Sequence, residues 1–73
     1  MKLRQTFAEN LARTRREKGL SQEQLGLEAD VDRSYVSLLE RGKSSASLDK
    51  IEKLAKALGV DPLALFAKPT KKR

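Results

Sequence analysis

The sequence predicts an all-α fold in which five short helices surround one core and the second and third helices form a helix-turn-helix. Apolar residues recur at three- and four-residue spacings along almost the whole chain, and no segment shows the alternation of a strand. Cap and glycine signals divide the chain into short helical segments. Two of these segments, within residues 22–41, are joined by a tight turn, which is typical of a motif whose second helix enters the DNA major groove.

The first predicted helix covers residues 3–18. Leu3, Phe7 and Leu11 recur every four residues, so they share one helix face. Gly19 is suited to end this helix because glycine takes positive φ without a steric cost.

The second predicted helix covers residues 22–29. Ser21 is its expected N-cap, and Gln24, three residues later, completes a capping box. Gly26 is a small residue at the point where two helices must approach each other closely. Asp30 stands at the turn, where aspartate tolerates left-handed backbone better than most residues.

The third predicted helix covers residues 33–41, with Asp32 as its N-cap. A polar loop, 42–46, leads to a fourth helix over 48–58 that Ser47 should cap.

A short fifth helix is predicted over 62–67, with proline at its first position. We expect residues 1–67 to form one DNA-binding domain whose last helix serves dimerisation, and residues 68–73 to form a basic, disordered tail. A chain of 73 residues buries only a small core, so association with a second copy would help to stabilise it.

The composition excludes several classes of function. The chain has no cysteine and no histidine, so it has no disulfide, no thiolate or imidazole metal site, and no cysteine or histidine catalysis. No apolar run approaches the ~20 residues that span a bilayer, and the N-terminus lacks the apolar segment of a secretory signal. We expect a cytoplasmic protein that is not an enzyme and has no cofactor, membrane partner or small-molecule ligand.

The charge distribution favours a polyanion as partner. The formal net charge is +6. Residues 21–40 nevertheless contain one arginine against five acidic residues, whereas the segments before and after them are basic. The predicted reading helix therefore lies between basic segments, which are placed to contact backbone phosphates.

Three segments carry a resemblance to a known family: RREKGLSQEQL, DVDRSYVSLLERG and SLDKIEKLAKALGVDPLALF. Together they resemble the lambda/434 repressor-type helix-turn-helix family, also called the Cro/CI or XRE family, over residues 7–66. The stretch DRSYVS-x-x-ERG is most similar to the controller proteins of restriction–modification systems. The chain departs from the family at Asp30, where glycine is usual, and at Ala46, where many relatives have proline.

The first residues of the third helix are the candidates for reading bases, because N-terminal residues of this helix reach base edges in helix-turn-helix proteins. Arg33 is suited to a bidentate contact with guanine, which is worth about 1–3 kcal/mol of discrimination. Leu38 admits two interpretations, a contact with a thymine methyl group or a simple exposed leucine. The full set is Arg33, Ser34, Tyr35, Ser37 and Leu38.

A second set of residues is predicted to contact phosphates. Gln22 opens the second helix, where the resemblance implies a DNA-contacting amide and where the helix end attracts anions. The cations and hydroxyls that follow the third helix suit either phosphate contacts or a solvated loop. They are Arg41, Lys43, Ser44 and Ser45.

Two further predictions concern structure. The resemblance implies a partly buried ion pair between Arg15 and Glu40. The apolar residues Val60, Leu63, Leu65 and Phe66 are predicted to form the dimer contact. In detail, we expect Val60 and Leu63 to pack on the core and at least one of Leu65 and Phe66 to be exposed. The alternative is that Phe66 only closes the core.

These features predict a sequence-specific transcription regulator that binds a palindromic operator in double-stranded DNA as a homodimer. The resemblance implies control of a restriction–modification operon, with RNA polymerase as a possible further partner. The alternatives are a phage-repressor or antitoxin-type regulator of the same fold, or a module for binding protein or RNA.

Overall fold

The computed structural model describes residues 2–68 and confirms the all-α prediction, because it contains helices and no strand within that range. Residue 1 and residues 69–73 lie outside the described part of the chain, and with them all of the predicted tail except Lys68. The elements are α1 (Leu3–Glu17), α2 (Gln22–Ala29), α3 (Arg33–Glu40), α4 (Leu48–Leu58) and the 3₁₀-helix η1 (Pro62–Phe66).

The predicted boundaries need small corrections. Helices α1 and α3 each end one residue early, with Lys18 and Arg41 as their C-caps. The fifth element is a 3₁₀-helix that ends at Phe66, not an α-helix that reaches Ala67. A 3₁₀-helix has three residues per turn, so its side chains point in other directions than those of an α-helix.

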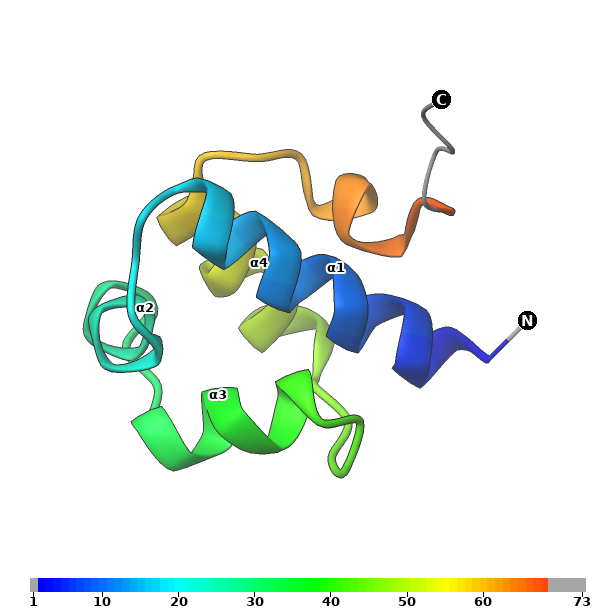
Figure 1. Ribbon diagram of the computed structural model, residues 1–73, viewed down its shortest axis with the longest axis horizontal. Helices are drawn as coiled ribbons and strands as arrows, with labels where there is room; N and C mark the ends of the chain where they lie inside the picture. The colour runs from blue at the N-terminus through cyan, green and yellow to red at the C-terminus, as the bar shows by residue number, and fades with distance from the viewer. Residues whose placement is uncertain (1, 69–73) are drawn as a thin grey trace.

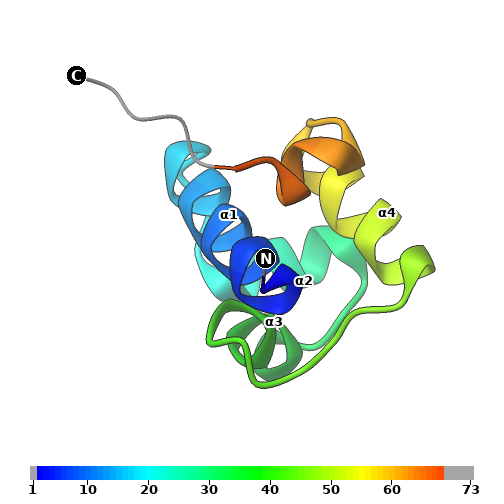
Figure 2. The ribbon, with the colours of Figure 1, turned by 90° about the vertical axis from the view of Figure 1, so that its right-hand side faces the viewer.

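Helix α1 crosses the middle of the molecule, with α3 below it, α4 behind it and η1 above it (Figure 1). The perpendicular view shows α1 almost end-on, with η1 and α4 to one side and α3 beneath (Figure 2). Helix α1 packs against α3 and η1, while α4 packs against α2 and η1. The exposed side of α3 is therefore free on the lower surface of the molecule.

Every element contributes one fully buried leucine to the core. This follows from the three- and four-residue spacings, which give each helix one apolar face. Since the chain is short, each of these side chains is a large share of the core. They are Leu11 in α1, Leu25 in α2, Leu39 in α3, Leu54 in α4 and Leu65 in η1.

The turn between α2 and α3 is built on Gly26 and Asp30, as predicted. A Cβ atom on Gly26 would lie 2.7 Å from the carbonyl oxygen of Val31, so only glycine fits there. Asp30 caps α2 in the left-handed region, with φ 59° and ψ 44°.

The predicted capping box at the start of α2 is also present, because the Ser21 hydroxyl accepts from the Gln24 amide and the Gln24 side chain accepts from the Ser21 amide. The capping box fixes the start of α2, whereas Gly26 and Asp30 shape the turn into α3.

A buried asparagine holds η1 against α1. The Asn10 side-chain amide donates to the carbonyl oxygens of Leu65 at 2.9 Å and Ala67 at 2.8 Å. The rings of Phe7 and Phe66 stack beside it with centroids 5.2 Å apart. The burial of Asn10 was not predicted, because nothing in its local sequence indicates it.

Candidate nucleic-acid interface

The exposed side of α3 and the start of α2 together form a shallow hollow. It is lined by Gln22, Asp32, Arg33, Ser34, Ser37, Leu38 and Arg41. Six of the ten residues predicted to contact DNA thus lie on one continuous surface, which we call the reading surface. Arg33, Ser34 and Arg41 are exposed, while Gln22 and Ser37 are half-buried.

The N-cap of α3 determines what Ser34 offers to a ligand. The carboxylate of Asp32 accepts from both the hydroxyl and the backbone N–H of Ser34. The hydrogen bond from this hydroxyl, with a smaller contribution from the backbone bond, holds the pKa of Asp32 below its ordinary value. Since the hydroxyl proton points to Asp32, the Ser34 oxygen is left as an acceptor. It therefore suits a base amino group better than a phosphate oxygen, which can only accept.

Leu38 is 37% exposed at the end of this surface. The buried side of α3 is supplied by Val36 and Leu39, as the three-residue spacing predicts. The exposure leaves Leu38 available for a contact with a thymine methyl group.

Tyr35 supports the loop that follows α3. Its ring is half-buried against the core, and its hydroxyl donates to the carbonyl oxygen of Ser45 at 3.2 Å. Ser45 is held from the other side by the Arg4 guanidinium, which donates to its hydroxyl at 3.0 Å. The loop is thus tied to both α1 and α3, and Figure 1 shows it projecting below the N-terminal end of α1.

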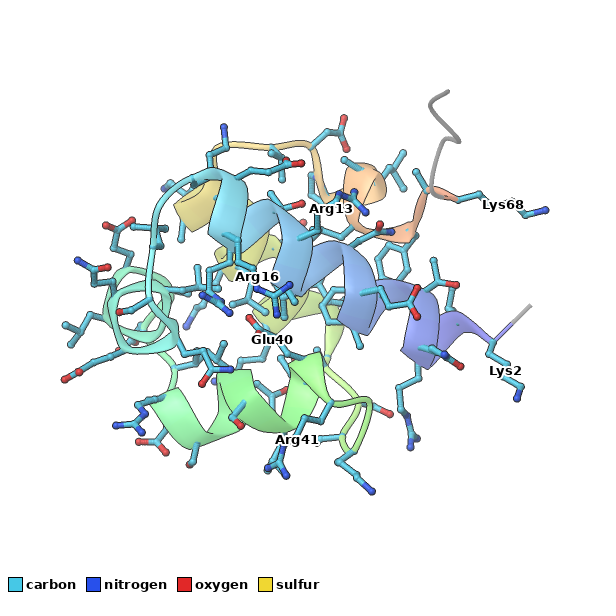
Figure 3. The ribbon with its side chains drawn as sticks, in the orientation of Figure 1. Lys2, Arg13, Arg16, Glu40, Arg41 and Lys68 are labelled. Carbon is cyan, nitrogen blue, oxygen red and sulfur yellow. The ribbon has the colours of Figure 1, made fainter. Side chains whose placement is uncertain are left out.

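Arg15 and Glu40, predicted to pair, form the ion pair between α1 and the end of α3. The Arg15 Nε atom lies 2.6 Å from Glu40 Oε2, and the two side chains are only 12% and 6% exposed. Figure 3 shows the Glu40 side chain rising from α3 toward α1. The hydrogen bond to Glu40 is the main cause that raises the pKa of Arg15, although burial acts in the opposite direction.

Glu40 also holds Gln22, a contact that the sequence analysis did not predict. The Gln22 Nε2 atom donates to Glu40 Oε1 at 3.0 Å, and the same oxygen accepts from Arg15 Nη2 at 3.0 Å. One carboxylate therefore fixes both the core guanidinium and an amide that lines the reading surface. No local signal reveals this contact, because it depends on how α2 packs against α3.

The predicted dimer contact requires correction. Leu65 is fully buried, so its side chain belongs to the core and has no surface to offer a partner. Leu63, expected to pack on the core, is instead 75% exposed. Val60 is half-buried against the core, as expected. Phe66 is also half-buried against the core, so neither Leu65 nor Phe66 is exposed, contrary to the prediction. The reason is the 3₁₀ geometry of η1, together with the Asn10 bonds that turn the Leu65 backbone toward α1.

An apolar groove lies between the start of α1, the start of α4 and η1. The apolar residues Leu3, Phe7, Leu48, Ile51 and Phe66 line it. Arg4, from the first turn of α1, and the loop residues Ser44, Ser45 and Ala46 complete the lining. Leu3 is 53% and Leu48 is 80% exposed. Leu3 was predicted to share an apolar helix face, but Leu3 and Leu48 are each the first residue of their helix and so project past the core. The apolar side chains of this groove, together with Leu63, make up what we call the apolar surface.

A profile of the helix-turn-helix family HTH_3 matches residues 11–65, which is most of the chain. The chain belongs to the HTH_3 family. It is a transcriptional regulator of this family, and the predicted resemblance is confirmed. Within residues 2–68, no helix of this HTH_3 protein is long and apolar enough to cross a membrane.

The HTH_3 protein is closely similar to controller proteins of restriction–modification systems. Control protein C.BamHI of Bacillus amyloliquefaciens is 46% identical over 65 residues, which cover 88% of this chain and 80% of the relative. Control protein C.MunI of a Mycoplasma species is 40% identical over 62 residues, 84% of each chain. The crystal structure of controller protein C.AhdI from Aeromonas hydrophila superposes with a TM-score of 0.84 at 46% identity, over 86% of this chain and 96% of that one.

Proposed function

We propose that this HTH_3 protein is a homodimeric, sequence-specific regulator that binds a palindromic operator in double-stranded DNA and controls a restriction–modification operon. The observation that carries the proposal is the hollow over α3, in which base-reading and phosphate-binding groups from two helices share one exposed surface. Similarity to control proteins supports the choice of operon. Such a regulator acts in the cytoplasm, with RNA polymerase as its further partner at the promoter.

Base reading is assigned to the exposed side of α3. Arg33, at the first helical position, reaches a guanine, and the Ser34 oxygen accepts from an adenine or cytosine amino group. Ser37 and Leu38, one turn later, contact the next base pairs. Tyr35 acts indirectly, since its hydroxyl is engaged by the loop backbone.

Phosphate binding is assigned to the two edges of the same surface. Gln22 is at the N-terminus of α2, where the backbone N–H groups and the helix dipole favour an anion. Its Nε2 atom has one hydrogen committed to Glu40, which orients the second toward the surface. On the other edge are Arg41, Lys43, Ser44 and Ser45.

The apolar surface is the proposed dimer contact, and its occupant is a second copy of the chain. Its exposed leucines, Leu3, Leu48 and Leu63, come from three different elements. Contiguous apolar patches on a small protein often mark an association surface. A twofold dimer would place two α3 helices about 34 Å apart, which is one turn of DNA and requires a palindromic operator.

Selection from random-sequence DNA tests the proposal, at ~150 mM salt so that phosphate attraction alone does not dominate. We expect a palindromic site that Arg33→Ala no longer selects, while Lys56→Gln on the exposed side of α4 still selects it. A palindrome beside genes of another kind would favour a phage-repressor or antitoxin-type regulator. Failure to recover any motif would contradict DNA reading and favour a module that binds protein or RNA.

A further inference from the structure

Basic side chains gather at a second hollow, beyond the C-terminal end of α3. This hollow lies between the first turns of α1 and the end of α3, and Lys2, Arg4 and Arg41 are the cations on its wall. Figure 3 shows Lys2 at the N-terminal end of α1 and Arg41 at the end of α3. Arg41 also lines the hollow of the reading surface over α3, so the two hollows adjoin at this residue.

Arg4 is held in place on this surface. Its Nη2 atom donates to the Ser45 hydroxyl at 3.0 Å, which joins the start of α1 to a loop 41 residues away in sequence. Among the described residues Arg4 forms no ion pair, and its side chain is exposed. Its other donors are therefore free to bind an anion in a fork geometry. Because the Ser45 oxygen accepts from Arg4, the Ser45 hydroxyl proton is also free to be donated.

The acidic residues of this hollow leave its cations available. Glu40 is engaged by Arg15 and Gln22, so its charge is already balanced. Glu9 accepts a hydrogen bond from Gln5 at 3.3 Å and forms no ion pair within residues 2–68. The three cations thus face one unbalanced carboxylate.

We propose that Arg4, assisted by Lys2 and Ser45, binds a backbone phosphate of the duplex that α3 reads. Helix α1 then takes part in DNA binding in addition to forming the core. The ligand class is a phosphodiester, because the three cations of this hollow outnumber its one unbalanced carboxylate and lie next to the reading surface. This inference rests on the proposed function and assigns to Arg4 a phosphate contact that the sequence predicted only for the basic segment before α2 as a whole.

The test is the salt dependence of binding of purified protein to the selected operator and to unrelated DNA, measured by fluorescence anisotropy. Replacing a cation that contacts a phosphate lowers the magnitude of the slope of log affinity against log salt by about one. It also weakens binding to all DNA sequences to a similar extent. We expect Arg4→Gln to show this change, with binding about two- to fivefold weaker near ~150 mM salt. Arg4→Lys should retain most of the slope, and Glu9→Gln should tighten binding.

Two controls separate the phosphate contact from a change in the loop. Ser45→Ala removes a neutral donor from the phosphate site but keeps the Arg4 charge, so it should weaken binding slightly and leave the salt slope nearly unchanged. Lys56→Gln removes an equal charge from α4 and should also leave the salt slope unchanged. An unaltered slope in Arg4→Gln would overturn the inference while the proposed function stands. If the wild-type protein bound the selected operator no more tightly than unrelated DNA, the proposed function would be overturned instead.

Discussion

Gln22, the first residue of α2, and Glu40, the last residue of α3, are joined by a hydrogen bond of 3.0 Å. The same carboxylate receives Arg15 from α1, so the two ends of the helix-turn-helix are fixed to the core through one side chain. The arrangement makes the reading surface depend on a buried ion pair. Its removal should therefore affect both folding and DNA binding.

Glu40→Ala should lower the free energy of unfolding by about 3–5 kcal/mol, because it leaves the Arg15 guanidinium buried without its partner. Urea denaturation followed by circular dichroism measures the change. Glu17→Ala is the matched control, since Glu17 pairs with Arg13 at 3.7 Å on the surface and should contribute about 0–1 kcal/mol. Equal stability of Glu40→Ala and the wild type would show that the pair does not stabilise the fold.

Gly26→Ala should destabilise the protein by about 1–3 kcal/mol, as overpacking does in a close contact. The added methyl group would lie 2.7 Å from the Val31 backbone oxygen, and a backbone atom cannot move aside without shifting α3. Thermal unfolding of Gly26→Ala beside Glu28→Ala, an exposed position of α2, checks this. If both variants melt alike, the approach of α2 and α3 is looser than the structure shows.

Leu48→Lys and Leu63→Lys should each weaken dimerisation, because a charged side chain would have to be desolvated within the apolar surface. Sedimentation equilibrium at micromolar concentration measures the shift toward monomer. Leu27→Lys is the control, since Leu27 is equally exposed, at 76%, but belongs to α2 and lies outside the groove. The dimer contact is elsewhere if both test variants sediment like the wild type.

Asp32 should make the α3 N-cap sensitive to acid. Its pKa is lowered in the folded protein by the Ser34 hydroxyl and backbone bonds, so its contribution is present above the ordinary aspartate value of 3.8. That contribution is lost as the pH falls through the lower folded-state pKa. The stability advantage of the wild type over Asp32→Asn should therefore shrink as the pH falls below that value. Urea unfolding over a pH series measures it, with Asp49→Asn as the control for loss of one charge.

The local features of this protein were predictable because they depend on neighbouring residues. A capping box needs only Ser21 and Gln24, three residues apart, and the turn needs a residue at 30 that tolerates left-handed backbone. Helix faces follow from the spacing of apolar residues in the same way. The sequence by itself therefore determined the helices, the helix-turn-helix and its position in the chain.

The tertiary structure decided which side chains of those helices are buried and which polar groups meet. Leu65 is buried and Leu63 exposed because η1 is a 3₁₀-helix that Asn10 holds from α1, 55 residues away. The contacts of Gln22 with Glu40 and of Arg4 with Ser45 likewise join distant segments. Such contacts form only when helices pack against each other. Packing sets the distance between residues that are far apart in the chain, and the spacing of residues in the sequence does not.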